Sequence, residues 1–468
     1  AYSDVLYVEA LIGPDTVNTM PPQTITAFLE HGQADLTLEQ DTGEAEEVIR
    51  SLERAGISME GVAAKLLADG VKSFADSFDK LLANIEEKKA LLLPIEHMER
   101  DISLGTQIPS VEATLADLQR RDVMDRIQRK DHTVWKPDPT EISNRLGWLN
   151  TTDLMSEQVP MLEAFAQEIR DAGYRHVVLL GMGGSSLGPE VLRQAFGSKS
   201  RYPELIVLDS TVPARVQAVT ETIDPTRTLF VVSSKSGRTI ETLSLYQHFN
   251  RMVEQRLGVE ASGKSFAAIT DSGTFLAKLA RDRRFRRVFV NPSDIGGRYS
   301  VLSYFGLVPA VLAGIDIVEL LDRADCMRKG CPPYAVAHNS PAAWLGAVMG
   351  TLASTGRDKL TLVTSPTIGS LELWVEQLLA ESTGKEGKGI MPVAGEPLAA
   401  PANYDDDRLF VYLRLEDDDN EDADTAMNSI EASGQPVVRL KLGDRYDLGG
   451  EFFRWELATT VAGALLGI

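Results

Sequence analysis

Two glycine- and serine-rich segments of the sequence have the residue types needed to bind a phosphate group. The first is VVLLGMGGSSLGPEVL, residues 177–192, and the second is TLFVVSSKSGRTIETL, residues 228–243. In both, a strand-like run leads into glycine and hydroxyl residues and then into a helix-like run. Backbone N–H groups, side-chain hydroxyls and the N-terminus of a helix can therefore face one anion. Two such loops at the carboxyl ends of strands predict a phosphate-binding site.

Each loop by itself also has another explanation. The first matches a dinucleotide-binding fingerprint only in part, because Ser186 stands at the third glycine position and Asp209 lies beyond the usual spacing of about 20 residues. Taken by itself, this loop is more typical of a tight turn without a ligand. In the second loop, Ser236 or Thr239 is typical of a helix cap. Phosphate binding is favoured because both loops occur together.

A guanidinium and a carboxylate suited to proton transfer occur further along the chain. Arg298 follows Gly296 and Gly297, which let the backbone approach a ligand, and its permanent charge suits an oxyanion that develops during a reaction. Gln377 and Glu381 stand four residues apart on one side of a helix-like segment that runs into a glycine-rich loop. A carboxylate at such a junction can act as a base. Taken alone, each charged residue is also typical of an exposed surface.

The elements that must position these residues have the pattern of two α/β domains. From His176 on, short β-branched runs alternate with helix-like segments; these runs are VVLL, LIVLD, TLFVVSS, SFAAIT and RVFVNP. After a helical stretch, LTLVTS, RLFVYLRL and VVRLKL repeat the alternation. The pattern is typical of parallel sheets covered by helices on both faces. We predict three regions: residues 1–92, residues 93–310 with a helical lead-in and the first sheet, and residues 311–468 with the second.

Composition narrows the classes of partner. The chain has 468 residues and a net charge of -21, which opposes nonspecific binding to nucleic acid or anionic lipid. The longest apolar stretch, Phe305 to Val318, is too short and interrupted to span a bilayer.

Cys326 and Cys331 match neither a zinc site nor a disulfide framework, which favours a cytoplasmic protein. The acidic runs at 405–407 and 416–424 lack the glycine of a calcium loop, so no metal site is predicted.

Four motifs, taken in order, resemble the phosphoglucose isomerase family from Trp148 to the end of the sequence. They are G-x-G-G-S-x-L-G-P in the first loop, S-K-[ST]-G-x-T-x-E-T in the second, G-G-R-[YF]-S at Arg298 and Q-x-x-x-E-S-x-G-K at Glu381. The resemblance implies an α/β fold of two doubly wound parallel-sheet sugar-isomerase (SIS) subdomains. It places the active site between them, at a homodimer interface.

The resemblance also implies a role for each matching residue. Glu381 would be the base that moves a proton between C1 and C2, Arg298 would stabilise the enediolate, and Gln377 would contact the sugar. The implied phosphate ligands are Gly184, Ser185, Ser234, Lys235, Ser236 and Thr239. The implied reaction interconverts glucose 6-phosphate and fructose 6-phosphate through an enediol intermediate and requires neither a metal nor an organic cofactor.

Two departures from the family's pattern leave ring opening unassigned. The histidine associated with that step normally follows the catalytic glutamate, but all six histidines of this chain precede Glu381. His338, in the second predicted subdomain, is more typical of a structural histidine. The segment WELATTVAGALLGI resembles the family's closing helix, but the catalytic lysine expected after it is missing. We expect that the sequence is cut at this end and also at its front.

Residues 1–92 resemble a second family. A predicted strand from Val5 to Leu11, a turn cluster and amphipathic helices up to Lys89 are similar to the last part of a transaldolase, a (β/α)₈ barrel enzyme. The tandem arrangement resembles a bifunctional transaldolase/phosphoglucose isomerase. That family's Schiff-base lysine lies on an earlier strand, and an incomplete barrel cannot close its sheet. No transaldolase activity is therefore expected from this chain.

Three alternative functions remain open at this point. The protein could be an isomerase that also accepts mannose 6-phosphate, because the missing histidine and lysine leave the stereochemical choice open. It could be a sugar-phosphate sensor that keeps the phosphate loops without catalysis. A nucleotide-binding dehydrogenase is disfavoured by the incomplete fingerprint.

Overall fold

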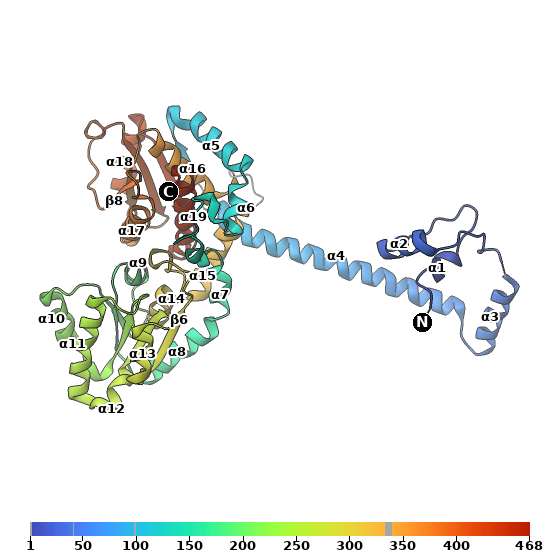
Figure 1. Ribbon diagram of the computed structural model, residues 1–468, viewed down its shortest axis with the longest axis horizontal. Helices are drawn as coiled ribbons and strands as arrows, with labels where there is room; N and C mark the ends of the chain where they lie inside the picture. Colours follow the sequence, from blue (N-terminus) through green and yellow to red (C-terminus); the bar gives the residue numbers. More distant parts are fainter. Residues whose placement is uncertain (1, 41, 98–99, 333–338) are drawn as a thin grey trace. The chain divides into compact units, whose positions relative to one another are not determined.

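The structure is a computed structural model that describes residues 2–40, 42–97, 100–332 and 339–468. The chain forms two compact units, Ala1–Lys88 and Lys89–Ile468. Among the described residues, the first unit holds helices only, and both sheets lie in the second unit (Figure 1). The predicted site residues all belong to the second unit.

The first unit is built from amphipathic helices. They are α1 (Leu6–Glu9), α2 (Pro22–His31), α3 (Thr42–Arg54) and the first part of α4 (Met59–His97). The strand predicted for residues 5–11 is wrong, because Leu6–Glu9 is helical. An apolar run forms a strand only when a neighbouring strand pairs with its N–H and C=O groups, and the described part of this unit contains none.

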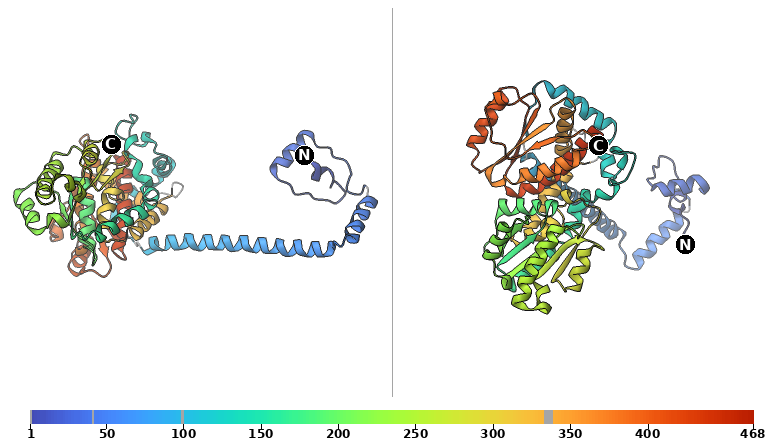
Figure 2. Two further views of the ribbon diagram at one scale, coloured as in Figure 1. Left: turned by 90° about the horizontal axis from the view of Figure 1, so that it is seen from below. Right: turned by 60° about the vertical axis from the view of Figure 1, so that its left-hand side comes forward.

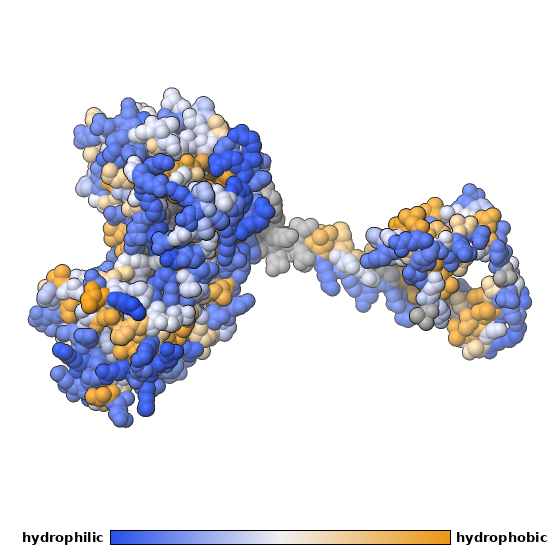
Figure 3. Space-filling model, viewed as in Figure 1, coloured by the Kyte–Doolittle hydropathy of each residue, from blue (hydrophilic) through white to orange (hydrophobic). Residues whose placement is uncertain are grey.

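Many apolar side chains of the first unit are exposed (Figure 3). Val17 is 91% exposed and Phe74 82%. Several lie at helical spacing along α4 and form an apolar stripe: Leu66, Leu67, Val71, Phe74 and Phe78. Contiguous apolar surface of this kind marks a contact surface.

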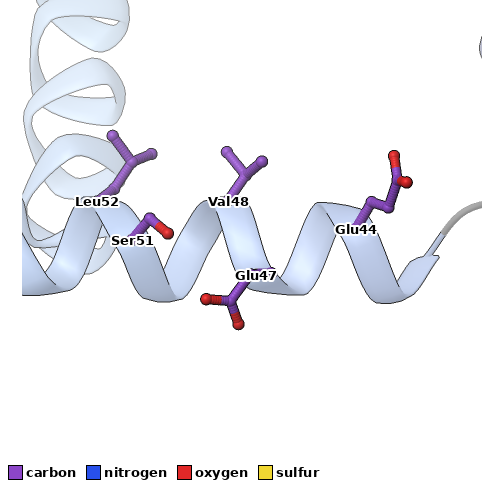
Figure 4. A pocket seen from close by; sticks show the side chains of 5 residues that line it. All are labelled: Glu44, Glu47, Val48, Ser51 and Leu52. Atoms are coloured by element: carbon purple, nitrogen blue, oxygen red, sulfur yellow. The ribbon is translucent and has the colours of Figure 1, made fainter.

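A surface pocket lies on α3 of the first unit (Figure 4). Its lining residues are Glu44, Glu47, Val48, Ser51 and Leu52. Val48 and Leu52 point to one side of the helix and Glu47 to the other (Figure 4). None of them is a predicted site residue, so this pocket does not belong to the predicted site.

The first sheet of the second unit is entirely parallel and has the strand order β3-β2-β4-β5-β6. Its strands are β2 (His176–Leu180), β3 (Glu204–Leu208), β4 (Thr228–Ser233), β5 (Phe266–Asp271) and β6 (Arg287–Asn291). They coincide with the five β-branched runs of the sequence, which confirms the predicted parallel sheet. The accompanying helices are α7 (Thr151–Ser156), α8 (Val159–Asp171), α9 (Leu187–Phe196), α10 (Pro213–Thr222), α11 (Ile240–Leu257), α12 (Val259–Ser262), α13 (Phe275–Asp282) and α14 (Tyr304–Leu312).

Helices cover both faces of this sheet because successive strand residues point to opposite sides. Val177 and Leu179 of β2 pack in one apolar core with residues of α8, α9 and α14. Val178 and Leu180 pack in a second core with residues of α11 and α13. Figures 1 and 2 show this layered arrangement around the green and yellow strands. The run HVVLL is therefore almost continuously apolar rather than alternating.

The second sheet has the order β1-β10-β9-β7-β8. Its strands are β1 (Arg100–Ser103), β7 (Lys359–Thr364), β8 (Met391–Val393), β9 (Arg408–Leu415) and β10 (Val437–Leu442), and only β1 runs antiparallel to its neighbour. Residues of α18 (Glu421–Ala432) cover one face. β1 falls in the predicted region 93–310 but joins this sheet, and α14 contains the predicted 310/311 boundary. The predicted domain bounds stay a prediction.

A group of helices fills the space on the other face of the second sheet. It consists of α5 (Ile108–Arg120), α6 (Val123–Gln128), α15 (Ile317–Lys329), α16 (Pro341–Ser354), α17 (Leu371–Thr383) and α19 (Leu448–Leu466). Every residue from Leu448 to Ala464 of α19 is buried. The ring of Phe452 on α19 lies 5.0 Å from that of Trp374 on α17, edge to face. α19 thus fixes α17, the helix that carries Glu381.

The apolar segment from Phe305 to Val318 is part of this packed interior. Residues 304–312 form α14, a buried helix with Pro309 inside it. Among the residues that the structure describes, no helix has both the length and the apolar character required to cross a bilayer.

The packing of α19 against α15 predicts that a side chain at position 449, in place of Gly449, destabilises the fold. A Cβ atom at this position would lie 2.0 Å from the carbonyl oxygen of Leu320, so Gly449→Ala must push the two helices apart. We expect the free energy of unfolding to fall by about 1–3 kcal/mol. Denaturant titration followed by circular dichroism measures it.

Gly443→Ala is the matched control for this prediction. A Cβ there would lie 3.5 Å from Asp447 Oδ2, an ordinary contact. Equal unfolding midpoints for the two variants would contradict the proposed close approach of α15 and α19.

Candidate functional site

The first glycine-rich loop lies directly against the backbone that carries Arg298. After β2, residues Gly183–Ser185 form a short 3₁₀ turn, and α9 begins at Leu187. A Cβ atom on Gly184 would lie 2.3 Å from the carbonyl oxygen of Gly297, so a hydrogen atom is all that fits. Gly184 is therefore required because two backbone segments meet there.

The second loop is held in shape by its own hydroxyl groups. Ser234 Oγ lies 2.9 Å from Thr239 Oγ1 and accepts a hydrogen bond from the N–H of Gly237 at 3.1 Å. Ser236 Oγ accepts from the N–H of Arg238 at 3.3 Å. Ser233 Oγ, at the end of β4, donates to the carbonyl of Ser185 at 3.3 Å and so connects the second loop to the first.

The two loops present helix N-termini whose N-cap side chains make no capping hydrogen bond in the described chain. The N-cap residue is Ser186 for α9 and Thr239 for α11. Their first N–H groups therefore keep their capacity to bind an anion. The helix-capping alternative is not supported for Thr239, and Ser236 bonds within its own loop.

Lys235 turns its side chain away from the hydroxyl groups of its loop. Its ammonium group forms an ion pair with Asp271 at 2.5 Å and donates to the carbonyl of Ser293 at 2.9 Å. Burial raises the pKa of Asp271, against the opposing effect of Lys235. The side chain of Lys235 therefore ties the loop to β5, and its backbone N–H is the group of this residue that could face an anion.

Glu381, Arg298 and Gln377 form one hydrogen-bonded group. Arg298 Nη1 lies 3.3 Å from Glu381 Oε2, and Gln377 Nε2 donates to Glu381 Oε1 at 3.0 Å. Each carboxylate oxygen thus has its own donor. The side chain of Glu381 is 51% exposed and that of Arg298 28%. A solvent-accessible carboxylate held between an amide and a guanidinium can accept and return a proton.

This group adjoins the first glycine-rich loop. A Cβ atom on Gly183 would lie 2.8 Å from Gln377 Nε2, and Gly184 contacts Gly297 and the N–H of Arg298. Ser300 Oγ donates to the carbonyl of Gly297 at 2.6 Å and lies 3.4 Å from that of Gly184. The structure therefore brings the two predicted catalytic residues to the first glycine-rich loop.

Sequence reasoning missed two close partners of the group. Ser382 accepts a hydrogen bond from Arg298 Nε at 2.7 Å, and the hydroxyl of Tyr299 lies 3.4 Å from Ser382 Oγ. Ser382 and Tyr299 both occur inside motifs of the sequence, beside Glu381 and Arg298. Their positions next to Glu381 and Arg298 in the sequence could have identified them as candidate site residues.

A histidine for ring opening is still not assigned. His338 lies outside the described residues. His176 begins β2, at the opposite end of the strand from the glycine loop, and His248 contacts Thr220. His132 contacts the carbonyl of Pro137.

Comparison with known proteins agrees with the sequence motifs. A family model described as phosphoglucose isomerase matches residues 162–390, a range that contains every predicted site residue. The comparisons support the phosphoglucose isomerase family. A family model described as transaldolase/fructose-6-phosphate aldolase matches residues 1–85.

Individual relatives of the isomerase family match parts of this chain. A glucose-6-phosphate isomerase of Staphylococcus saprophyticus is 30% identical over 57% of this chain and 59% of its own length. A glucose-6-phosphate isomerase of Carboxydothermus hydrogenoformans is 32% identical over 51% of this chain and 53% of its own length. The chain thus spans little more than half the length of these relatives.

A solved structure supports the fold. The crystal structure of a glucose-6-phosphate isomerase from Chlamydia trachomatis matches with a TM-score of 0.65 and 17% identity. The match covers 76% of this chain and 82% of that one.

The charges of the site predict a lowered pKa for Lys385, which follows Glu381 on the chain. Loss of hydration and the nearby charge of Arg298 lower the pKa of Lys385, whose ammonium group donates to the carbonyl of Ser382 at 3.1 Å. Arg298→Met should therefore raise the pKa of Lys385, which ¹⁵Nζ-detected NMR titration measures. Because the folded chain binds fewer protons between the folded and unfolded pKa values, Lys385 should make stability rise with pH across this window.

Arg251→Met removes the same charge from α11 and serves as the control. It should leave the titration of Lys385 unchanged. A pKa of Lys385 that does not respond to Arg298→Met would show that the two groups do not interact.

Proposed function

We propose that this protein is an aldose-ketose isomerase that interconverts glucose 6-phosphate and fructose 6-phosphate through an enediol or enediolate intermediate. The observation that carries the proposal is the position of Glu381. Its carboxylate is held by Arg298 and Gln377 directly beside the glycine-rich loop that contains Gly183 and Gly184. The similarity of residues 162–390 to phosphoglucose isomerase supports the same reaction.

In the proposed mechanism, Glu381 acts as the base between C1 and C2 of the open-chain sugar. Its carboxylate removes the proton from C2 of the aldose and returns it to C1, so one group serves both directions of the reaction. Negative charge develops on the sugar oxygens in between, and the guanidinium of Arg298 stabilises it because that side chain stays charged. Gln377 holds Glu381 from the other side and contacts the sugar.

The phosphate group is proposed to bind between the two loops. Its ligands would be Gly184, Ser185, Ser234, Lys235, Ser236 and Thr239, with Gly184 and Lys235 contributing their backbone. The Ser234 and Thr239 hydroxyls already lie within hydrogen-bond distance of each other and can both turn to one anion. The uncapped N-termini of α9 and α11 add N–H donors. Neither a metal ion nor an organic cofactor takes part.

Replacing the base tests the chemical step. Glu381→Gln keeps the shape and the contact with Gln377 but cannot take up a proton, so kcat should fall by about 10²–10⁴-fold. A coupled assay with fructose 6-phosphate and an excess of glucose-6-phosphate dehydrogenase measures it.

Glu376→Gln, on the exposed face of the same helix, is the matched control and should keep the wild-type kcat. Substrate binding without turnover in the wild-type protein would instead favour a sensor of sugar phosphates. Equal turnover of mannose 6-phosphate would favour the dual phosphoglucose/phosphomannose isomerase.

Removing the loop hydroxyls tests the phosphate site. Ser234→Ala and Thr239→Ala each remove one donor to a charged group, so each should raise KM by about tenfold and change kcat less. Initial rates over a range of fructose 6-phosphate concentrations measure both constants. Ser244→Ala, an exposed serine on α11, is the control. An unchanged KM in both loop variants would remove the phosphate assignment.

The finer context of the enzyme is also a proposal. The exposed side chain of Glu381 leaves the site open on one side, which supports its completion by a second subunit in a cytoplasmic homodimer. Residues 1–92 are proposed to be the C-terminal segment of a (β/α)₈ transaldolase barrel in a bifunctional polypeptide. The family match over residues 1–85 and the apolar stripe of α4 support this. The segment alone should have no transaldolase activity.

A further inference from the structure

Arg298 reaches the carboxylate of Glu381 through a contact that cannot by itself fix its position. The two groups meet at 3.3 Å through Nη1 alone, and half of the Glu381 side chain is exposed. Ion pairs of this kind contribute little free energy to holding a side chain in place, because water competes for both charges and a long side chain keeps its rotational freedom. Something else must hold the guanidinium where charge develops on the substrate.

Ser382 provides a second and shorter contact. Arg298 Nε donates to Ser382 Oγ at 2.7 Å, so the guanidinium is held at its Nε while its Nη groups stay available for Glu381 and for substrate. Ser382 follows Glu381 directly on α17. The base and the anchor of the guanidinium therefore move together as one helical segment.

Tyr299 in turn limits the orientation of Ser382. Its hydroxyl lies 3.4 Å from Ser382 Oγ, and its ring packs against Trp148 with centroids 5.2 Å apart. Burial raises the pKa of Tyr299, so the phenol stays protonated and can share a hydrogen bond with Ser382. The contacts form a chain from the aromatic core through Tyr299 and Ser382 to Arg298.

We propose that Ser382 is a positioning residue of the isomerase, which fixes the guanidinium of Arg298 over the reacting carbons, and that Tyr299 fixes Ser382. The inference rests on the proposed function of this same site. The proposal requires no contact of either residue with the substrate. Both act on the rate of the chemical step through Arg298. When the guanidinium is misplaced, the stabilisation of the enediolate falls more than the stabilisation of the bound sugar phosphate.

The kinetic test separates positioning from binding. Ser382→Ala should lower kcat by about tenfold and change KM by less than about twofold, the expected loss of one hydrogen bond to a charged group. Ser382→Thr keeps the hydroxyl and should recover most of the loss. Tyr299→Phe keeps the ring and should lower kcat by a smaller factor. Ser354→Ala, whose hydroxyl bonds to its own helix at the carbonyl of Gly350, is the control and should behave as wild type.

A double-mutant cycle shows whether Ser382 acts through Arg298. In an Arg298→Met background, Ser382→Ala should cause no further fall in kcat, because the group that it positions is gone. The same fold-loss in both backgrounds would overturn the proposal, as would a wild-type kcat for Ser382→Ala.

A measurement without turnover distinguishes this inference from the proposed function. With ¹⁵N-arginine labelling, the Nε–Hε signal of Arg298, assigned by its loss in Arg298→Met, should exchange slowly with water in the wild-type protein and quickly in Ser382→Ala. Slow exchange in an inactive wild-type protein would refute the isomerase and keep the anchor. Equal exchange in the two proteins would refute the anchor whatever the activity.

Discussion

The close approach of two backbone segments is the constraint on which the site depends. Gly184, after β2, lies so close to the carbonyl group of Gly297, after β6, that no side chain fits at position 184. That contact sets Arg298 beside the first glycine-rich loop, and Arg298 then reaches across to Glu381 on α17. A bulkier residue at Gly184 would move the loop relative to the guanidinium, whereas a Cβ atom on Gly297 would meet no atom within 4 Å. Gly184 is thus required by packing between loops, whereas Gly183 has a positive φ and is required by the conformation of the turn.

A chain with a net charge of -21 must build any anion site from local groups. The structure offers mainly oriented dipoles for this purpose, since the N-termini of α9 and α11 carry no cap from their own N-cap side chains. The ammonium group of Lys235 is already balanced by Asp271, so the loop gains little free charge from it. Arg298 is held between Glu381 and Ser382, where its charge lies beside a carboxylate. In the proposed function, binding and chemistry therefore depend on different groups.

The parts of the fold that sequence predicted well are those with a strong local pattern. Runs such as HVVLL and TLFVVS are apolar throughout because both faces of their sheet are covered, and they were recognised as buried parallel strands. The run from Val5 to Leu11 has a similar composition but folds as a short helix, because strand formation depends on a partner that no local pattern reports. The pairing of β1 with β10 could not be predicted from local sequence either, since more than 300 residues separate the two strands.

The site shows the same division. The sequence by itself determined which residue types could bind a phosphate and move a proton, because glycines, hydroxyls, a carboxylate and a guanidinium occur at spacings that local geometry can interpret. Only the tertiary structure decided that Arg298 meets Glu381 and Ser382, more than 80 residues away, and that Tyr299 stands behind Ser382. Those contacts arise from the packing of α17 on α19 and of one loop on another. Such packing depends on shape across the whole unit, which periodicity along a chain does not record.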